Sequence, residues 1–441
     1  MIPTIGDRRL AAAARALLLL LIFSLAFMRP SFRLLGFNGT PTDLIFIPLV
    51  LSWAAALLLR QAPLRWGRAH WLLAGYFAAL TLSALASGHP GASAAKLASQ
   101  VYLLSLPVIA LSLIRDDADL RRAVRFWLAG TAVTAMVAVA ALLLFYLDRQ
   151  NPFLRHMLFY SGTLPHGNYP RVRLTFLNGN LLCNYLTVSL CLLLVAQRSR
   201  WITPTRGRLL GAGVALSAVL TISPGLGGFA LALALWLWLC RRDSSPAFTR
   251  LALAAGIGAA VLFVAAMTVT PILHPTAPFL IHLPGTALIL APSGRLMTWM
   301  AAWRNFLADP LFGRGIGHDS VYVPYLDPSG HLQKLTDAHN SFLNLAAQCG
   351  VVGLVAFLLL LAFILRRTFP MRFLPGDANV VRLGLGLALL NGFAYQGLGG
   401  SFEDARHLWV LLGLFLAAVR LEDRGRSEPP LRSGHSSAPP P

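Results

Sequence analysis

The chain has few charged residues for its length, since Asp, Glu, Lys and Arg make up only 12% of 441 residues. A soluble globular protein carries roughly twice that fraction, so the composition argues against a water-soluble fold. Cysteine is also rare: Cys183, Cys191, Cys240 and Cys349 lie in or beside apolar stretches and form no Cys-x-x-Cys pair. This spacing argues against a structural zinc site and against a disulfide framework.

What the chain has instead is apolar sequence, with 56% hydrophobic residues and a mean hydropathy of +0.64. Stretches near the length that crosses a bilayer, about 20 residues, recur throughout. They fall near 10–28, 43–60, 71–87, 97–114, 122–147, 174–196, 208–222, 224–240, 250–270, 340–365, 382–398 and 406–421. We therefore predict an all-α polytopic membrane protein with about twelve transmembrane helices. The first stretch lacks a small-residue cleavage pattern, which favours a retained span over a signal peptide.

Basic residues predict the orientation, because short loops rich in Arg or Lys stay on the cytoplasmic side. Alternate connections hold the arginines: Arg60, Arg65, Arg68; Arg115, Arg121, Arg122, Arg125; Arg198, Arg200, Arg206, Arg208; Arg241, Arg242; and Arg366, Arg367, Arg372. Both termini are thus expected in the cytoplasm. The net charge of +20 follows mainly from this topology and from attraction to anionic membrane lipids. Nucleic-acid binding is disfavoured, because the arginines are dispersed over many loops.

The same pattern divides the chain into four parts. Residues 1–270 are expected to hold transmembrane helices 1 to 9 with short loops, and 271–338 a large external loop carrying short helices. Residues 339–422 then hold helices 10 to 12. Residues 423–441, rich in Ser, Gly, Arg and Pro, are expected to form a disordered cytoplasmic tail.

The large loop contains one clear helical pattern. Ser293 is a plausible N-cap, and Trp299 and Trp303 recur at helical spacing before Pro310 ends the segment. This amphipathic helix either lies at a bilayer interface, which tryptophan favours, or packs against a core. Residues 311–317 form a glycine-rich turn whose backbone can approach a ligand closely.

After the loop, the polar pair His339-Asn340 stands directly before a long apolar run, which indicates chemistry at a membrane surface. Several motifs occur in a fixed order: Ser293-Gly294-Arg295, Trp303, Asp309 to Gly317, His339-Asn340 and Gly350-Val351-Val352-Gly353. This order resembles the shared core of bacterial O-antigen ligases and the related O-antigen polymerases. The nine residues between His339-Asn340 and Gly-x-x-Gly match the ligase motif without a gap.

The resemblance extends over about 170–420. Upstream, the segment from Arg171 to Asn180 is similar to the arginine and asparagine segment of the family. One turn departs from the family pattern, because residues 223–228 read Ser-Pro-Gly-Leu-Gly-Gly and lack the arginine that related chains often place there.

The resemblance implies a metal-independent, inverting glycosyltransferase without a cofactor. Its donor would be a glycan on undecaprenyl pyrophosphate, and its acceptor lipid A-core at the periplasmic face. The resemblance thus implies a bacterial inner-membrane protein in which the large loop 271–338 and the active site are periplasmic. Such a transfer needs a base for the acceptor hydroxyl and cations for the leaving pyrophosphate. His339 is the candidate base, since its ordinary pKa of about 6.5 lets it accept a proton near neutral pH; alternatively it only anchors its helix. Arg173 and Arg295 are the preferred diphosphate ligands, with Arg171 and Arg314 as further candidates.

Two asparagines complete the candidate site. Asn180 is expected to orient sugar hydroxyls or Arg173, or else to join helices by hydrogen bonds. Asn340 either orients His339 or caps its helix. Near the last helix, Glu403 or Asp404 either pairs with Arg295 or helps position the acceptor, or simply favours a helix N-terminus.

Several functions remain open at this point. The motif spacing favours a ligase that joins O-antigen to lipid A-core over a polymerase that elongates the glycan on its carrier. A protein O-oligosaccharyltransferase is less attractive without a sizeable extra soluble domain, and a transporter would place charges within the spans. A metal-dependent transferase is disfavoured, because the Asp117-x-Asp119 pair falls in a cytoplasmic loop.

Overall fold

The structure is a computed structural model of the chain. It describes residues 9–34, 37–65, 67–161, 169–239, 246–272, 281–282, 285, 289–317, 319–326, 332–369 and 377–427. Cys240 and most of the tail that we expected to be disordered, 428–441, lie outside these residues.

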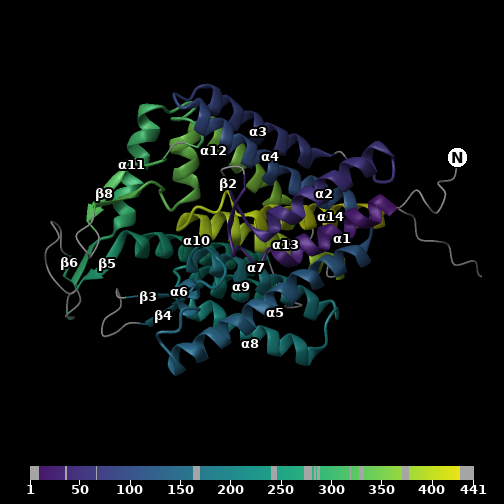
Figure 1. The fold of residues 1–441 in the computed structure, drawn as a ribbon, viewed down its shortest axis with the longest axis horizontal. Helices are drawn as coiled ribbons and strands as arrows, with labels where there is room; N and C mark the ends of the chain where they lie inside the picture. Colours follow the sequence, from purple (N-terminus) through teal and green to yellow (C-terminus); the bar gives the residue numbers. More distant parts are fainter. Residues whose placement is uncertain are drawn as a thin grey trace, which may run out of the picture.

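Helices make up most of the described chain (Figure 1). They are α1 (Arg9–Ser24), α2 (Pro41–Leu58), α3 (Arg68–Leu85), α4 (Pro90–Leu113), α5 (Asp117–Leu147), α6 (Leu154–Met157), α7 (Gly179–Arg198), α8 (Pro204–Leu220), α9 (Leu226–Leu239), α10 (Pro246–Thr268), α11 (Gly294–Ala308), α12 (Ser341–Thr368), α13 (Asp377–Leu389) and α14 (Arg406–Ser427). A π-helical turn (Leu390–Tyr395) and a 3-10 turn (Gln396–Leu398) follow α13.

Five of the described helices, α2, α4, α5, α7 and α12, are both long and apolar enough to cross a bilayer. The expected count of about twelve spans is not confirmed. Several predicted spans form shorter helices: α9 has 14 residues, and α13 changes into the π-helical turn after 13 residues. At 1.5 Å per residue, such helices are shorter than the roughly 30 Å hydrocarbon layer.

Short strands also occur, which the all-α prediction missed. They are β1 (Phe32–Leu34), β2 (Phe37–Gly39), β3 (Leu158–Ser161), β4 (Tyr169–Val172), β5 (Val269–Ile272), β6 (Ile281–His282), β7 (Ile289–Pro292), β8 (Val323–Leu326) and β9 (Leu332–Leu335). All pair antiparallel, as β1-β2, β3-β4, β5-β7-β6 and β8-β9. The described residues of the large loop therefore form one long helix, α11, and short sheets, where we expected several short helices.

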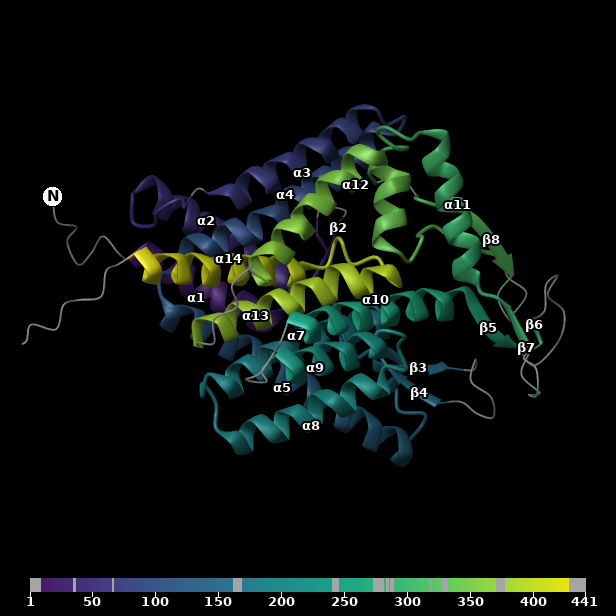
Figure 2. The same ribbon diagram turned by 180° about the vertical axis from the view of Figure 1, so that it is seen from behind.

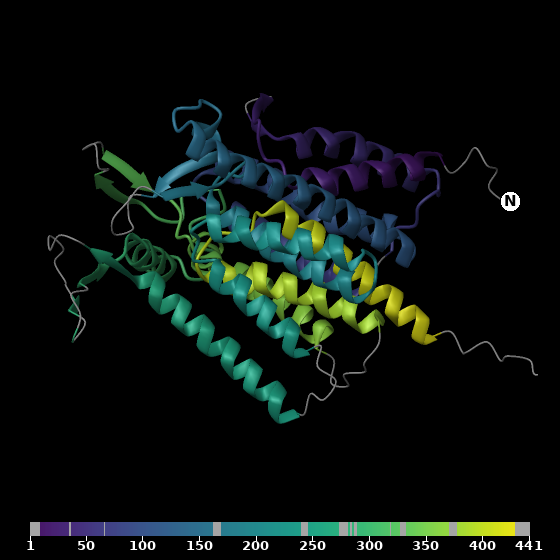
Figure 3. The same ribbon diagram turned by 90° about the horizontal axis from the view of Figure 1, so that it is seen from below.

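The centre of the bundle is α7. Its side chains from Leu182 to Leu193 are buried without interruption, and it packs on α5, α8, α9 and α13. By contrast, α10 lies at the edge (Figure 3) and exposes Ile257, Val261 and Leu262. Exposed apolar side chains at the periphery suit a membrane protein, whose outer surface faces hydrocarbon.

The long helix α12 is broken at Gly350, where the backbone adopts φ 62° and ψ −162° (Figure 2). The segment 309–317, which contains the glycine-rich residues 311–317 and is called the turn 309–317 below, fills the break. The amides of Val351 and Val352 donate to carbonyls of this turn, at 2.8 and 3.3 Å, while amides of the turn donate to Ala347 and Gln348 at 3.1 and 2.9 Å. The turn thus satisfies the backbone groups that the interruption of the helix leaves without partners.

The two ends of the bundle differ. At one end, the His339 end, lie α11, β5 and β8 (Figures 1 and 2). At the other, the Arg420 end, α1 begins and α14 ends. Both α4 and α7 run from the His339 end to the Arg420 end. At the Arg420 end, Arg420 on α14 donates hydrogen bonds to the carbonyls of Leu111 and Ile114, where α4 ends.

Candidate active site

His339 lies in the loop just before α12, at the end of the bundle where the hairpins gather. Its backbone has φ 50°, in the left-handed region that a residue with a Cβ rarely adopts. The side chain is 45% exposed, so solvent or a ligand can reach the imidazole. Burial of the rest of the ring is the largest influence on its pKa and lowers it from the ordinary value, with nearby Arg295 adding to this effect. The imidazole is therefore neutral at pH 7 and free to accept a proton.

Asp337 holds this loop. Its carboxylate accepts a hydrogen bond from the backbone amide of His339 and lies 3.5 Å from His339 Nδ1. It also accepts a bond of 2.5 Å from Ser401 Oγ, which ties the loop to the approach of α14. The carboxylate counteracts the lowering of the His339 pKa. A proton on Nδ1, facing Asp337, leaves Nε2 as the basic nitrogen.

Asn340 is the N-cap of α12. Its Oδ1 accepts from the amides of Phe342 and Leu343, at 3.0 and 3.1 Å, and its Nδ2 donates to the Leu398 carbonyl at 3.1 Å. The capping alternative for Asn340 is thus the one that the geometry supports. By fixing the first turn of α12, Asn340 also fixes the loop that carries His339.

Arg295 comes from α11, which begins as predicted, with Ser293 Oγ accepting from the amide of Leu296. The half-buried guanidinium donates through Nη1 to the carbonyl of Gly399. Burial lowers the pKa of Arg295, nearby Arg171 lowers it further, and Asp337 opposes the change. Arg295 is therefore close enough to Arg171 for its own pKa to be affected, and close enough to His339 to affect the pKa of the imidazole.

Arg171, on β4, is fixed by two neighbours. Its Nε donates to the Thr221 carbonyl at 2.9 Å, and its Nη2 donates to Asn180 Oδ1 at 2.8 Å. Asn180 Oδ1 also accepts from Ser223 Oγ at 2.9 Å. Asn180 thus contacts Arg171, whereas the sequence left open whether it orients sugar hydroxyls or Arg173 or joins helices. The Ser223 turn, which departs from the family pattern, joins the site through a hydroxyl.

Arg173 and Arg314 lie elsewhere on this end. Arg173 donates through Nε to the His156 carbonyl at 3.0 Å; its pKa is lowered by burial and then by Arg29, not by Arg171 or Arg295. Arg314 is exposed in the turn after α11 and lies 3.6 Å from Asp309. Of the four predicted diphosphate ligands, Arg171 and Arg295 are therefore the two that influence the same site, whereas Arg173 and Arg314 have other neighbours.

The turn 309–317 does not leave its glycines open to a ligand. A Cβ at Gly313 would lie 2.4 Å from the backbone of Gln348, and one at Gly315 would lie 2.2 Å from Ser87. Both glycines have positive φ. The close approach that we expected is therefore made to the protein itself, to α12 and to the connection between α3 and α4.

Two acids flank the site without contacting Arg295. Asp404 pairs with Lys96 and accepts from Gln100 at 2.6 Å. Glu403 is buried and accepts from Asn344 Nδ2 at 2.6 Å. Burial, with the neighbouring Asp404 and then Asp337, raises the pKa of Glu403 to about 7. Glu403 therefore titrates near neutral pH.

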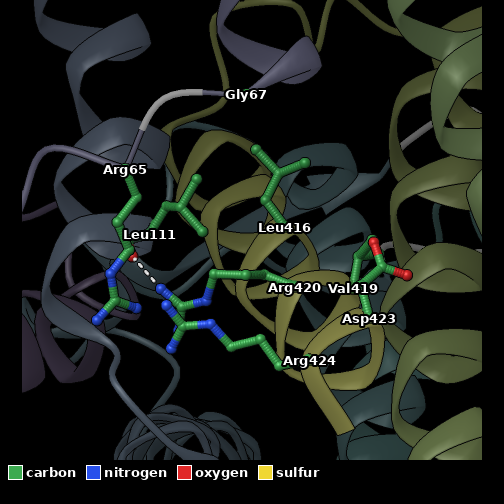
Figure 4. A pocket seen from close by; sticks show the side chains of 8 residues that line it. All are labelled: Arg65, Gly67, Leu111, Leu416, Val419, Arg420, Asp423 and Arg424. Atoms are coloured by element: carbon green, nitrogen blue, oxygen red, sulfur yellow. Dashed lines mark hydrogen bonds between the residues drawn. The ribbon is translucent and has the colours of Figure 1, made fainter. Parts of the chain in front are cut away.

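A separate pocket lies at the Arg420 end (Figure 4). The guanidinium groups of Arg65, Arg420 and Arg424 are turned toward one another there, while the carboxylate of Asp423 points away. Arg65 and Arg420 both donate to the carbonyl of Ile114, at 3.0 and 2.6 Å, and so cap the C-terminus of α4. The pocket is distant from His339 and does not belong to the candidate site.

Asp337, Asn344 and Ser223 were missing from the site residues that we predicted. The contact of Asp337 with His339 could have been predicted, because an acid two residues before a histidine in a loop can reach the histidine amide and ring. Asn344 and Glu403 are 59 residues apart in the chain, and no local pattern links them.

Comparison with protein families agrees with the motif order. Residues 209–358, about a third of the chain, match the family model described as O-antigen ligase. This match confirms the resemblance and includes Arg295, Asp337 and His339, but not Arg171 or Asn180. No curated protein is significantly similar to the chain.

Proposed function

From the match of residues 209–358 to the O-antigen ligase family, we propose that this membrane protein is an O-antigen ligase. It transfers glycan from undecaprenyl pyrophosphate to lipid A-core, and its His339 end faces the periplasm from the inner membrane. One observation carries the proposal. The accessible, neutral imidazole of His339 lies near two guanidinium groups, those of Arg295 and Arg171, at one end of an apolar bundle.

His339 acts as the general base in this proposal. The acceptor hydroxyl oxygen attacks the anomeric carbon of the donor, and its proton passes to Nε2 of His339. The bond between that carbon and the pyrophosphate oxygen breaks, and undecaprenyl pyrophosphate leaves with the electron pair. Asp337 positions the ring and stabilises the imidazolium that forms.

Arg295 and Arg171 stabilise the leaving pyrophosphate. Both remain charged at physiological pH although burial lowers their pKa values, because guanidinium groups are very weak acids. Arg171 lowers the pKa of Arg295, and positive charges close enough for this effect favour a bound anion. Arg173, Arg314 and the other polar groups at this end are proposed to guide the donor headgroup.

The ligase is preferred to a polymerase because the spacing from His339-Asn340 to Gly350 matches the ligase motif. The two activities share a donor and differ in the acceptor. A polymerase would transfer the growing glycan to the next carrier-linked repeat, whereas a ligase requires lipid A-core.

Reconstitution tests the proposal. Purified protein in liposomes is given carrier-linked glycan with either lipid A-core or a carrier-linked single repeat as acceptor, with and without EDTA. Transfer to lipid A-core only, unchanged by EDTA, supports the ligase. Elongation of the carrier-linked repeat supports the polymerase, and loss of transfer with EDTA contradicts a metal-independent reaction.

A further inference from the structure

An apolar groove runs along the outer side of α5 and α8, two helices that pack on each other. It encloses about 790 Å³. Its walls are small or aliphatic side chains: Leu128, Ala129, Ala132, Ala135, Met136, Val139, Ala140, Leu143, Leu209, Leu210 and Gly213. Met136, Leu143 and Leu209 are 63, 59 and 71% exposed, so the groove is open to the surroundings of the bundle.

The groove ends in a basic pocket of about 890 Å³. Arg125, Ile202 and Arg206 line both spaces, which makes them continuous. Arg200 and Arg208 add two further guanidinium groups to the pocket. The combined space therefore has the form of an amphipathic ligand, with a long apolar part and an anionic head.

The positive charge of the pocket is not balanced locally. No acidic residue is among the side chains described as lining it. Arg125 bonds only a neutral group there, the carbonyl of Trp201, at 2.7 and 3.2 Å. Arg206 and Arg208 follow the start of α8, where cations are disfavoured by the helix dipole and where the first turn contains no acid. A bound anion would relieve this repulsion.

The position of the pocket fits a membrane surface. It lies where α7 ends and α8 begins, at the Arg420 end of the bundle, since Asn180 at the start of α7 lies beside Arg171 at the His339 end. From the pocket, the groove follows α5 and α8 toward the middle of the bundle. An occupant with its head at the arginines would therefore have its chains at the depth of the bilayer hydrocarbon.

We propose that α5 and α8 bind an anionic phospholipid from the leaflet opposite His339, with its phosphate against Arg125, Arg200, Arg206 and Arg208 and its acyl chains in the groove. This site is independent of the glycan transfer proposed above. The chemistry requires both parts, because a free anion gains nothing from the groove and a zwitterionic lipid gains little from four arginines.

Native mass spectrometry of the purified full chain, titrated with phosphatidylglycerol or phosphatidylcholine, tests the proposal. The variant Arg206→Gln/Arg208→Gln removes two charges from the pocket. The matched control Arg121→Gln/Arg68→Gln removes two exposed charges outside the residues that line it. We expect phosphatidylglycerol to bind about 25-fold more weakly to the pocket variant, roughly fivefold per arginine, and within about twofold of wild type to the control.

A second variant separates a lipid from a soluble anion. Ala129→Trp keeps every charge and fills the groove from an exposed position. Weaker phosphatidylglycerol binding by this variant, with no competition from inorganic phosphate, supports the lipid site. Equal binding of both lipids by the wild type, equal losses in pocket and control variants, unchanged binding by Ala129→Trp, or displacement by phosphate would overturn it.

Discussion

Gly350→Ala is expected to destabilise the protein strongly, because the break in α12 depends on a glycine. The backbone at this position, φ 62° and ψ −162°, is a conformation that is essentially restricted to glycine and costs other residues about 1–3 kcal/mol. A Cβ would also lie 2.3 Å from the carbonyl oxygen of Leu311 and 2.7 Å from the amide nitrogen of Phe312. These are backbone atoms and cannot rotate away, so the turn 309–317 must move.

Movement of the turn has a further cost. Its four hydrogen bonds with α12, from 2.8 to 3.3 Å, are worth about 1 kcal/mol each. Losing even part of them, together with the backbone strain, gives a loss of at least about 3 kcal/mol. We expect the apparent melting temperature of the detergent-purified protein, followed by tryptophan fluorescence, to fall by several degrees.

Gly75→Ala is the matched control, because Gly75 lies inside α3 and a Cβ there meets no atom within 4 Å. Alanine favours a helix over glycine by about 1 kcal/mol, so this variant should melt at or above the wild-type temperature. If Gly350→Ala and Gly75→Ala melt alike, the account of the break in α12 is wrong.

Three further predictions concern the candidate site. First, activity depends on neutral His339, and because the pKa of His339 is lowered, the acid limb of the kcat/KM profile should lie below pH 6.5. Asp337→Asn removes a carboxylate that raises this pKa, so the acid limb should shift to still lower pH. The same variant should reduce the rate about 10²-fold or more. An unshifted limb would show that Asp337 does not act through His339. Second, the raised pKa of Glu403 means that the folded state binds more protons than the unfolded state between about pH 4.5 and 7, so this group's stabilising effect is lost as pH rises through that range. Glu403→Gln should flatten the melting temperature over this range, and an unchanged pH dependence would contradict the assignment. Third, Asn180→Ala leaves Arg171 Nη2 and Ser223 Oγ without their shared acceptor, and should raise KM for the carrier-linked donor more than it changes kcat; a pure loss of kcat would contradict this positioning role.

The sequence predicted those features that depend on local chemistry. Ser293, the predicted N-cap, begins α11, because a side-chain oxygen at an N-cap needs only its own next few amides. Capping was one of the two roles left open for Asn340, which begins α12. The apolar pattern of α11 did not predict which of its side chains are buried, because Trp299 is buried whereas Met300 and Trp303, on the same predicted face, are exposed.

The features that sequence could not predict depend on contacts between distant segments. Hydropathy showed one continuous apolar run through Gly350, and it gave no sign that the turn at 309–317 is hydrogen-bonded into a break there. It also could not choose among arginines on the same side. Arg171 on β4 lowers the pKa of Arg295 on α11, whereas the neighbouring charge that lowers the pKa of Arg173 is Arg29.

The most direct test of the central claim is made in the native host, with His339→Ala expressed at the wild-type level. His156→Ala, an exposed histidine at the same end of the bundle, is the matched control. Lipopolysaccharide gels are compared with the glycan that remains on the lipid carrier. We predict bare core with long glycan accumulating on the carrier for His339→Ala, and a normal ladder for His156→Ala. A core capped by a single repeat would indicate the polymerase, and an unchanged ladder for His339→Ala would contradict its role as the base.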